Sequence, residues 1–154
     1  VEKYSLASSV KVGERRIIAV ASGFKTKNSR SRESIRLLNW GLRKFDTIKV
    51  AKKDEVFTSL NVWLGKKGKV DILPSENIYL TIPKRKKKTI EAIIEYEGPV
   101  EAPIKKGDKL GILNVYLSGE LVKQIDLISS ENIKRSNIFS RLLKSLNYLV
   151  WGDV

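Results

Sequence analysis

The chain has 154 residues and a mass of 17.5 kDa, which is enough for about one globular domain. Its 42% of apolar and 31% of charged residues are typical of a globular protein. The sequence contains no His and no Cys, which excludes a Ser-His-Asp triad, a thiol nucleophile, a disulfide and a metal site built on His or Cys. We therefore expect no metal and no cofactor.

Positive charge is the second marked feature of the composition. The chain carries 30 Lys and Arg against 17 Asp and Glu, a net charge of +13. Such a surface attracts nucleic acid, anionic lipid or another anionic polymer, and charge alone does not choose among them. No apolar run approaches the roughly 18 residues of a membrane span, and the N-terminus has no signal-peptide core. Since Met is also absent, we expect Val1 to lie inside a longer protein.

The first 46 residues predict a hairpin followed by a helix. Residues 4–10 and 16–22 are short, apolar and β-prone, and the polar link between them contains one Gly. A basic loop then leads to a helix over residues 31–45, with Ser31 as its N-cap and a periodic apolar stripe. We expect the hairpin to expose apolar strand faces, at Ile17, Ile18 and Val20.

From residue 47 the pattern changes to many short strands. Their turn signals contain Gly, Pro, Asn and Ser, as in an antiparallel sandwich or barrel. We predict a small all-β sandwich domain over residues 47–132. Its expected strands are 47–51, 55–64, 69–73, 77–82, 89–96, 99–103, 109–117 and 120–128.

Residues 133–154 predict a polar linker and an amphipathic helix that binds an anionic membrane surface. The polar face of this helix carries Arg141 and Lys144 and no acidic residue, and Trp151 closes its end. Packing onto the β domain and docking into a partner protein remain alternatives. The apolar face consists of Ile138, Phe139, Leu142, Leu143, Leu146, Leu149 and Val150.

Two sequence patterns that have chemical roles in other proteins are explained here by chance or by solvent exposure. The spacing S-x-x-K occurs at Ser8–Lys11 and Ser22–Lys25, but about two matches are expected by chance from 15 Ser and 21 Lys. Both serines lie in expected strands, where positions i and i+3 face opposite sides. The basic run 84–88 follows Pro83, and we interpret it as a solvated loop between two strands.

Several segments together resemble the C-terminal part of the low-molecular-mass penicillin-binding proteins, the D-alanyl-D-alanine carboxypeptidases. Residues 33–42 read ESIRLLNWGL and resemble the family's E-S-x-x-L-L-x-W-G helix, which is the most specific segment. The resemblance continues through NVWLG at 61–65, YLTIP at 79–83 and APIKKG at 102–107. It covers essentially the whole chain.

The resemblance implies a mixed α+β fold in three parts. Residues 1–46 would be the C-terminal edge of a penicillin-binding, β-lactamase-like transpeptidase domain, residues 47–132 a β-sandwich stalk, and residues 133–154 a linker and membrane-anchor helix. The family's S-x-x-K nucleophile, S-x-N and K-T-G motifs would lie upstream of Val1. We therefore expect no catalytic residue in this chain and no activity from the chain alone.

One residue of the family's site has a counterpart here. Arg30 corresponds to an Arg that the family carries in the loop between strand and helix, where it supports recognition of the substrate's terminal carboxylate. A guanidinium suits this task because it can bind a carboxylate through two hydrogen bonds. The alternative is a solvated loop residue, since Arg30 is one of several cations between Lys25 and Arg36.

By this resemblance the parent is a penicillin-sensitive serine-type carboxypeptidase that trims peptidoglycan stem peptides. It would bind β-lactam inhibitors and attach peripherally to the outer, periplasmic face of the bacterial cytoplasmic membrane, and no nucleic acid partner is expected. Two alternatives remain open. One is a basic nucleic-acid-binding β protein, supported by the charge of +13, and the other is a non-enzymatic membrane-surface module.

Overall fold

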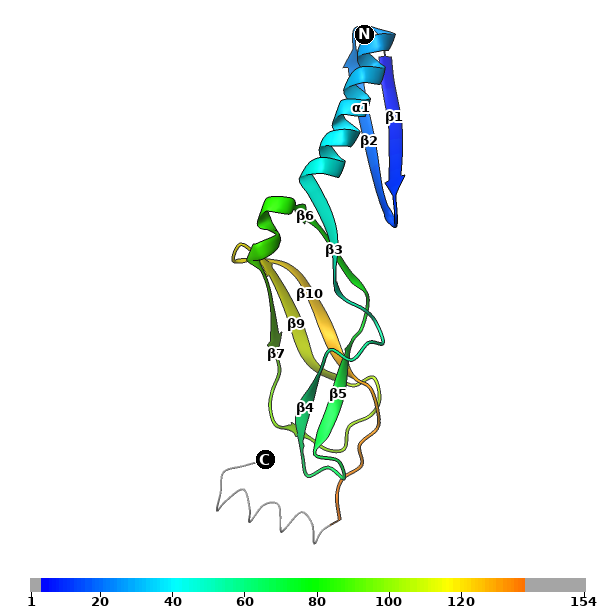
Figure 1. The fold of residues 1–154 in the computed structure, drawn as a ribbon. Coiled ribbons are helices and arrows are strands. Elements are labelled where there is room, and N and C mark those ends of the chain that lie inside the picture. Colours follow the sequence, from blue (N-terminus) through cyan, green and yellow to red (C-terminus); the bar gives the residue numbers. More distant parts are fainter. Residues whose placement is uncertain (1–3, 138–154) are drawn as a thin grey trace. The chain divides into compact units, whose positions relative to one another are not determined.

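Two compact units make up the chain in the computed structural model, which describes residues 4–137 (Figure 1). Among the described residues, the first unit consists of residues 4–48 together with 80–87. The second consists of residues 49–79 together with 88–137. The division does not follow the sequence continuously, because a short segment of the β-rich region belongs to the first unit.

The first unit contains the expected hairpin. Strands β1 (Tyr4–Val12) and β2 (Arg15–Phe24) pair antiparallel, with Val12 opposite Arg15. Gly13 occupies the tight turn between them at φ +59°, a conformation that glycine adopts without steric cost. The hairpin prediction is confirmed, and β1 is two and β2 three residues longer than expected.

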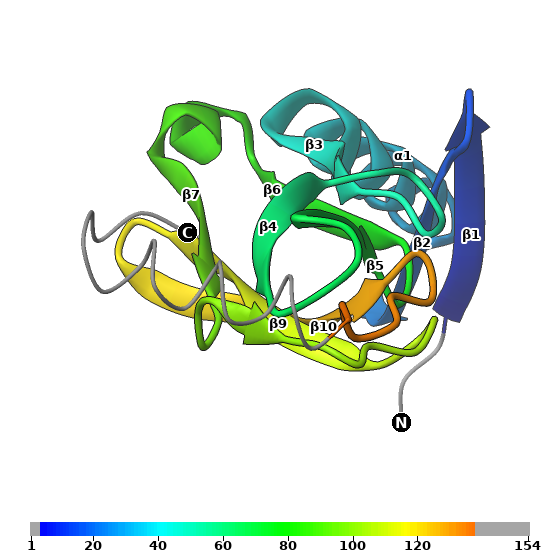
Figure 2. The ribbon, with the colours of Figure 1, turned by 90° about the horizontal axis from the view of Figure 1, so that it is seen from below.

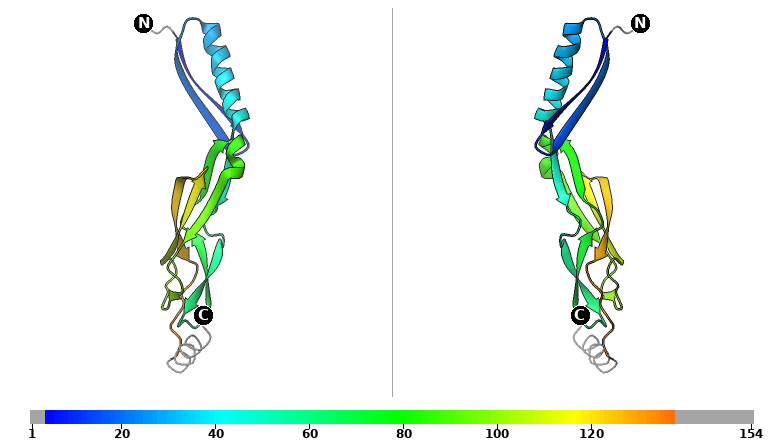
Figure 3. Two further views of the ribbon diagram at one scale, coloured as in Figure 1. Left: turned by 90° about the vertical axis from the view of Figure 1, so that its left-hand side faces the viewer. Right: turned by 90° about the vertical axis from the view of Figure 1, so that its right-hand side faces the viewer.

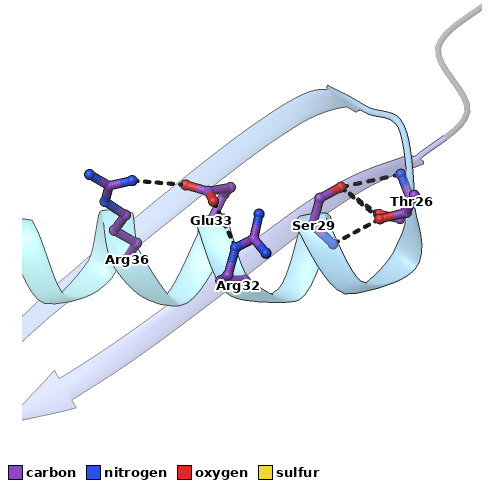
Figure 4. Close-up of polar contacts among 5 residues, drawn as sticks. All are labelled: Thr26, Ser29, Arg32, Glu33 and Arg36. Carbon is purple, nitrogen blue, oxygen red and sulfur yellow. Dashed lines mark hydrogen bonds and ion pairs between the residues drawn. The ribbon is translucent and has the colours of Figure 1, made fainter.

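Helix α1 (Lys27–Lys44) begins four residues before the predicted start. Thr26, not Ser31, is the N-cap: its hydroxyl accepts a hydrogen bond from the amide of Ser29, and the hydroxyl of Ser29 accepts one from the amide of Thr26 (Figure 4). This reciprocal pair satisfies two amides of the first turn. The expected basic loop over residues 23–30 is therefore partly helical.

One face of the hairpin packs against α1, and the other is open (Figure 3). Ala19 of β2 and Ser34 and Gly41 of α1 are buried where the helix meets the strands. On the opposite face Ile18 and Val20 are 67% and 75% exposed, as expected. Ile17 departs from the expectation: it is half-buried against α1, because alternation along the strand turns it toward the helix.

Nine further elements follow α1, and their order agrees closely with the predicted strands. They are β3 (Phe45–Ala51), β4 (Thr58–Trp63), β5 (Lys69–Pro74), β6 (Ile78–Pro83), the 3-10 helix η1 (Lys84–Thr89), β7 (Ile90–Glu95), β8 (Val100–Glu101), β9 (Lys109–Leu117) and β10 (Glu120–Ser129). The run 84–88, predicted as a loop, forms most of η1. Strands β3 and β6 form a separate two-stranded sheet.

The other strands of the β-rich region form one six-stranded sheet in the order β7-β9-β10-β5-β4-β8. Four of its five pairings are antiparallel, and the short β4–β8 pairing is parallel, which the all-antiparallel prediction missed. The β4–β5 hairpin joins the β9–β10 hairpin through the antiparallel pairing of β5 with β10 (Figure 2). The sandwich-like fold is thus confirmed. Its core includes Leu60, Val62, Val70, Ile72, Leu113, Val115, Ile125 and Leu127.

Candidate functional site

Most of the net positive charge of the chain belongs to the first unit. Residues 1–48 and 80–87 carry 15 Lys and Arg against only 4 Asp and Glu, a net charge of +11. The rest of the chain carries 15 basic and 13 acidic residues and is therefore nearly neutral. A partner attracted by charge would thus be attracted mainly by the first unit.

The predicted site residue Arg30 lies in the first turns of α1, not in the loop where it was expected. Its side chain is half-buried, and the guanidinium carbon lies 5.9 Å from the centre of the Tyr4 ring on β1. This is the distance at which a cation and an aromatic face attract each other. The Nε atom of Arg30 is buried and has no hydrogen-bond partner within the described residues. One donor of the guanidinium, Nε, is therefore left without a partner among residues 4–137.

Two further arginines on α1 share one acidic neighbour (Figure 4). Nε of Arg32 lies 3.0 Å from one carboxylate oxygen of Glu33, and Nη1 of Arg36 lies 3.7 Å from the other. Both arginine side chains are largely exposed to solvent. Because one carboxylate serves two guanidinium groups, this part of the helix surface keeps a net positive charge.

The S-x-x-K pairs do not form a catalytic arrangement. The hydroxyl of Ser8 donates to the carbonyl of Ala19 across the hairpin at 3.4 Å, on the face covered by α1. Lys11 is exposed, three positions along the same strand. Ser22 is exposed near the end of β2, and Lys25 follows beyond the strand. Across residues 4–137, no cluster of three or more Asp and Glu has an arrangement that could hold a metal ion.

The predicted membrane-binding residues lie outside the described residues. They are Ile138, Phe139, Arg141, Leu142, Leu143, Lys144, Leu146, Leu149, Val150 and Trp151. Among the helices that the structure describes, none is sufficiently long and apolar to cross a membrane.

Two features of this surface were missed by sequence reasoning. The first is the contact of Arg30 with Tyr4, for which the only signal is that strand alternation turns Tyr4 toward the helix side of the hairpin. The second is that Lys84 and Arg85 line the same hollow as Trp40. These residues are more than forty positions apart, and no local pattern predicts that they meet.

Comparison with known proteins agrees with the fold. Residues 45–135 match the family model described as the C-terminal domain of penicillin-binding protein 5. The chain is 36% identical over 140 residues to the D-alanyl-D-alanine carboxypeptidase DacC of Escherichia coli strain K12, a match that covers 90% of this chain and 35% of DacC. It is 30% identical over 141 residues to DacA of the same strain, covering 91% of this chain and 35% of DacA.

Solved structures give a similar result. Penicillin binding protein 5 from Haemophilus influenzae matches with a TM-score of 0.70 and 28% identity, over 86% of this chain and 39% of that one. The D-alanyl-D-alanine carboxypeptidase DacD from Francisella tularensis matches with a TM-score of 0.62 and 28% identity, over 88% of this chain and 34% of that one. The chain therefore spans only about a third of the length of these relatives.

The family match extends across β3 to β10 and covers more than half of the chain. It spans the segments 61–65, 79–83 and 102–107 that carried the resemblance in the sequence, whereas residues 33–42 lie before it. The resemblance is thereby confirmed, and the chain belongs to the family of the penicillin-binding protein 5 C-terminal domain.

Proposed function

We propose that this chain is the C-terminal part of a serine-type D-Ala-D-Ala carboxypeptidase that trims peptidoglycan stem peptides. The observation that carries the proposal is similarity to proteins named D-alanyl-D-alanine carboxypeptidase over about 90% of this chain. These relatives are nearly three times as long as the match, so the proposed catalytic machinery belongs to a part of the parent outside this chain. The nucleic-acid-binding alternative gains no support from them.

In the proposed parent, a serine hydroxyl attacks the carbonyl carbon of the peptide bond between the two terminal D-alanines, which breaks the C–N bond, releases the last D-alanine and leaves an acyl-enzyme ester. Water then hydrolyses the ester. A β-lactam acylates the same serine and is released slowly, which is the basis of its inhibition. This chain supplies none of the reacting groups and is inactive alone. Its own role is positional, as a stalk over residues 47–132 and an anchor over residues 133–154.

The open face of the hairpin supports the assignment of residues 1–46 to the edge of a larger catalytic domain. Ile18 and Val20 are mostly exposed, although both are strongly apolar. The β1–β2 sheet has only two strands, so each strand has one unpaired edge within the described residues. Apolar sheet faces and open strand edges are normally covered in a finished domain. In the parent, further strands and helices of the catalytic domain would cover them.

Arg30 is the one candidate for substrate contact. Arg30 forms no ion pair within residues 4–137, which supports a role in which its terminal nitrogens bind the carboxylate at the end of the stem peptide. The Tyr4 ring, 5.9 Å away, would hold the side chain in place while leaving its terminal nitrogens free to donate. Substitution of Arg30 by Lys in the parent should raise KM for the peptide more than it lowers kcat.

The location that follows from this function is the periplasmic face of the cytoplasmic membrane. The amphipathic pattern of residues 138–151 and the two cations on its polar face support peripheral attachment to anionic lipid. The test is co-sedimentation with vesicles that contain phosphatidylglycerol. Leu142→Asp with Leu146→Asp should abolish binding, whereas Ser140→Asn with Ser145→Asn on the polar face should not. Unchanged binding of the Asp variant would refute the anchor.

The proposed activity is tested in native membranes of the source organism. The membranes are labelled with a fluorescent penicillin, and proteins are then captured with an antibody against this chain. The proposal expects a labelled band clearly larger than 17.5 kDa. An unlabelled band near 17.5 kDa would contradict it and would favour a non-enzymatic binding module.

A further inference from the structure

A basic hollow with an aromatic wall lies within the first unit, beside the C-terminal end of α1. We call it the Trp40 groove. It has a volume of about 480 Å³. Its apolar wall is formed by Trp40, Phe45 and Pro83. Its charged lining comes from two elements, α1 with Arg43 and Lys44, and η1 with Lys84 and Arg85.

Trp40 offers an aromatic surface in this groove. Its side chain is 52% exposed, which is unusual for a tryptophan on a helix that already packs one face against a sheet. The Phe45 ring lies against it edge-on, with ring centres 5.0 Å apart at an interplanar angle of 70°. This contact supports one side of the indole and leaves the remainder open. The groove therefore has a positioned stacking surface.

The four cations of the groove are not neutralised by the protein. Arg43, Lys44, Lys84 and Arg85 are all exposed, and none of them forms an ion pair within residues 4–137. The acidic residue nearest in sequence, Asp46, pairs with Lys87 at 3.5 Å. The negative end of the α1 dipole explains why cations occur at Arg43 and Lys44. It does not account for Lys84 and Arg85, which a different element supplies to the same hollow.

The binding surface is elongated. A second hollow of about 400 Å³ runs back along α1 and shares Trp40, Arg43 and Lys44 with the Trp40 groove. It adds Arg32 and Arg36, which share the single carboxylate of Glu33. Two adjoining hollows lined by cations on both sides of one indole suit an anionic strand better than a small molecule.

We propose that the Trp40 groove binds a carboxylate-bearing glycan–peptide strand, as a second contact for the polymer whose peptides the parent trims. This inference rests on the proposed function. The flat, apolar face of a sugar ring would stack on Trp40, while the guanidinium and ammonium groups would bind carboxylates of the peptides. Single-stranded nucleic acid fits less well, because such sites stack successive bases on several aromatic side chains and the groove exposes one.

The experiment is co-sedimentation of the full 154-residue chain with lipid-free peptidoglycan sacculi. The test variant carries Lys84→Gln with Arg85→Gln, and the matched control carries Lys105→Gln with Lys106→Gln. Lys105 and Lys106 are also adjacent and exposed but lie in the second unit, so both variants lose the same charge. The test variant should bind about tenfold more weakly than the wild type, and the control should bind like the wild type.

Two further comparisons examine the chemistry of the ligand. Sacculi whose carboxylates have been converted to neutral amides should bind poorly. Trp40→Leu keeps an apolar side chain but removes the ring, and it should also weaken binding. Equal loss in the test and control variants would overturn the proposal, since it would show attraction by net charge alone. Tighter, groove-dependent binding of oligo-dT than of sacculi would replace it with a nucleic acid site.

The binding experiment with sacculi and the penicillin-labelling experiment can fail independently of each other. Penicillin labelling of the parent with no binding of this chain to sacculi would refute the groove and leave the carboxypeptidase assignment intact. Groove-dependent binding to sacculi without any penicillin-labelled parent would refute the carboxypeptidase assignment and leave the groove intact.

Discussion

Gly41 of α1 lies directly against Ile17 of β2. A Cβ atom at position 41 would lie 3.2 Å from Cδ1 and 3.5 Å from Cγ2 of Ile17. The glycine is buried, and the absence of a side chain is what lets the helix lie this close to the hairpin. This contact is one of those that hold α1, which carries Arg30 and Trp40, against the hairpin.

Gly41→Leu should destabilise the first unit by about 1–3 kcal/mol, because the added side chain has no space without moving Ile17 or the helix. Gly41→Ala should be nearly neutral, since the gain in helix propensity of about 1 kcal/mol offsets the tight contact. Thermal unfolding followed by circular dichroism measures both. The control is Asn39→Leu, at an exposed position of the same helix. A stability of Gly41→Leu equal to that of the control would contradict the packing.

Arg15 fastens the end of α1 to the hairpin. Its Nη1 donates to the carbonyl of Phe45 at 2.7 Å, and its Nη2 donates to the carbonyl of Gly41 at 2.9 Å. The Gly41 carbonyl also accepts the capping hydrogen bond from the Phe45 amide, and the Phe45 carbonyl lies just beyond the last turn, where intrahelical donors run out. Arg15→Met should therefore cost about 1–2 kcal/mol and increase hydrogen exchange in the last turn of α1. Arg16→Met should have little effect, because Arg16 makes one exposed 3.4 Å contact with Ser9.

The core of the second unit should respond independently of the first. Leu113 of β9 is fully buried, so Leu113→Ala should cost about 2–5 kcal/mol. Ile93 of β7 is 47% exposed, and Ile93→Ala should cost much less. Hydrogen exchange provides the readout, since amides of β9 and β10 should lose protection in Leu113→Ala while those of β1 and β2 do not. A uniform loss across both units would show a single cooperative unit.

The Lys52–Glu55 pair should make the stability of the fold depend on pH. A hydrogen bond from Lys52, at 2.5 Å, lowers the pKa of the Glu55 carboxyl below its ordinary value of 4.5, and the charge of Lys49 lowers it further. A carboxyl with a lowered pKa in the folded state stabilises the fold above its ordinary pKa, and this contribution is lost as the pH falls through the lowered value.

An NMR titration of the Glu55 carboxyl measures this effect. Lys52→Met should move the pKa of Glu55 back toward 4.5, and Lys53→Met should leave it unchanged. Lys53 is the matched control because it is exposed and only its backbone amide is engaged, with Asn77. The same pair raises the pKa of Lys52, mainly through its hydrogen bond to Glu55, so that contribution is lost only at alkaline pH. If Glu55 had the same pKa in Lys52→Met as in the unsubstituted chain, the hydrogen bond would be excluded.

Local patterns predicted most of the elements. The strand over residues 109–117 has the predicted bounds, and the others differ by a few residues, because alternation and turn residues act over short distances. The start of α1 was misplaced since the capping box uses Ser29 where Glu or Gln is the usual signal, so Thr26 was not recognised. The order of strands in the six-stranded sheet depends on contacts far apart in sequence, and no local pattern encodes it.

The candidate site was predictable only in part. Arg30 was named as a candidate through the family resemblance and stays a prediction, and its contact with Tyr4 joins two elements that are separated in sequence by β2. The Trp40 groove could not be predicted, because the 3-10 helix that supplies Lys84 and Arg85 was interpreted as a solvated loop. A site formed by residues of one helix or strand can be predicted from the sequence, whereas a site formed by residues of several elements can be identified only in the folded structure.

The hairpin with its open apolar face should be more sensitive to proteolysis than the second unit. Residues 4–48 contain 10 Lys and Arg and residues 88–137 contain 7, so a large difference in their cleavage rates reflects stability more than the number of trypsin sites. A two-stranded sheet with one helix and an apolar face at Ile18 and Val20 is marginally stable in water. Trypsin should therefore cleave within residues 4–48 well before it cleaves within 88–137, as mass spectrometry of the fragments will show. Equal resistance of both regions would mean that the hairpin and α1 are stable without further covering, which would remove the main structural support for their origin in a larger catalytic domain.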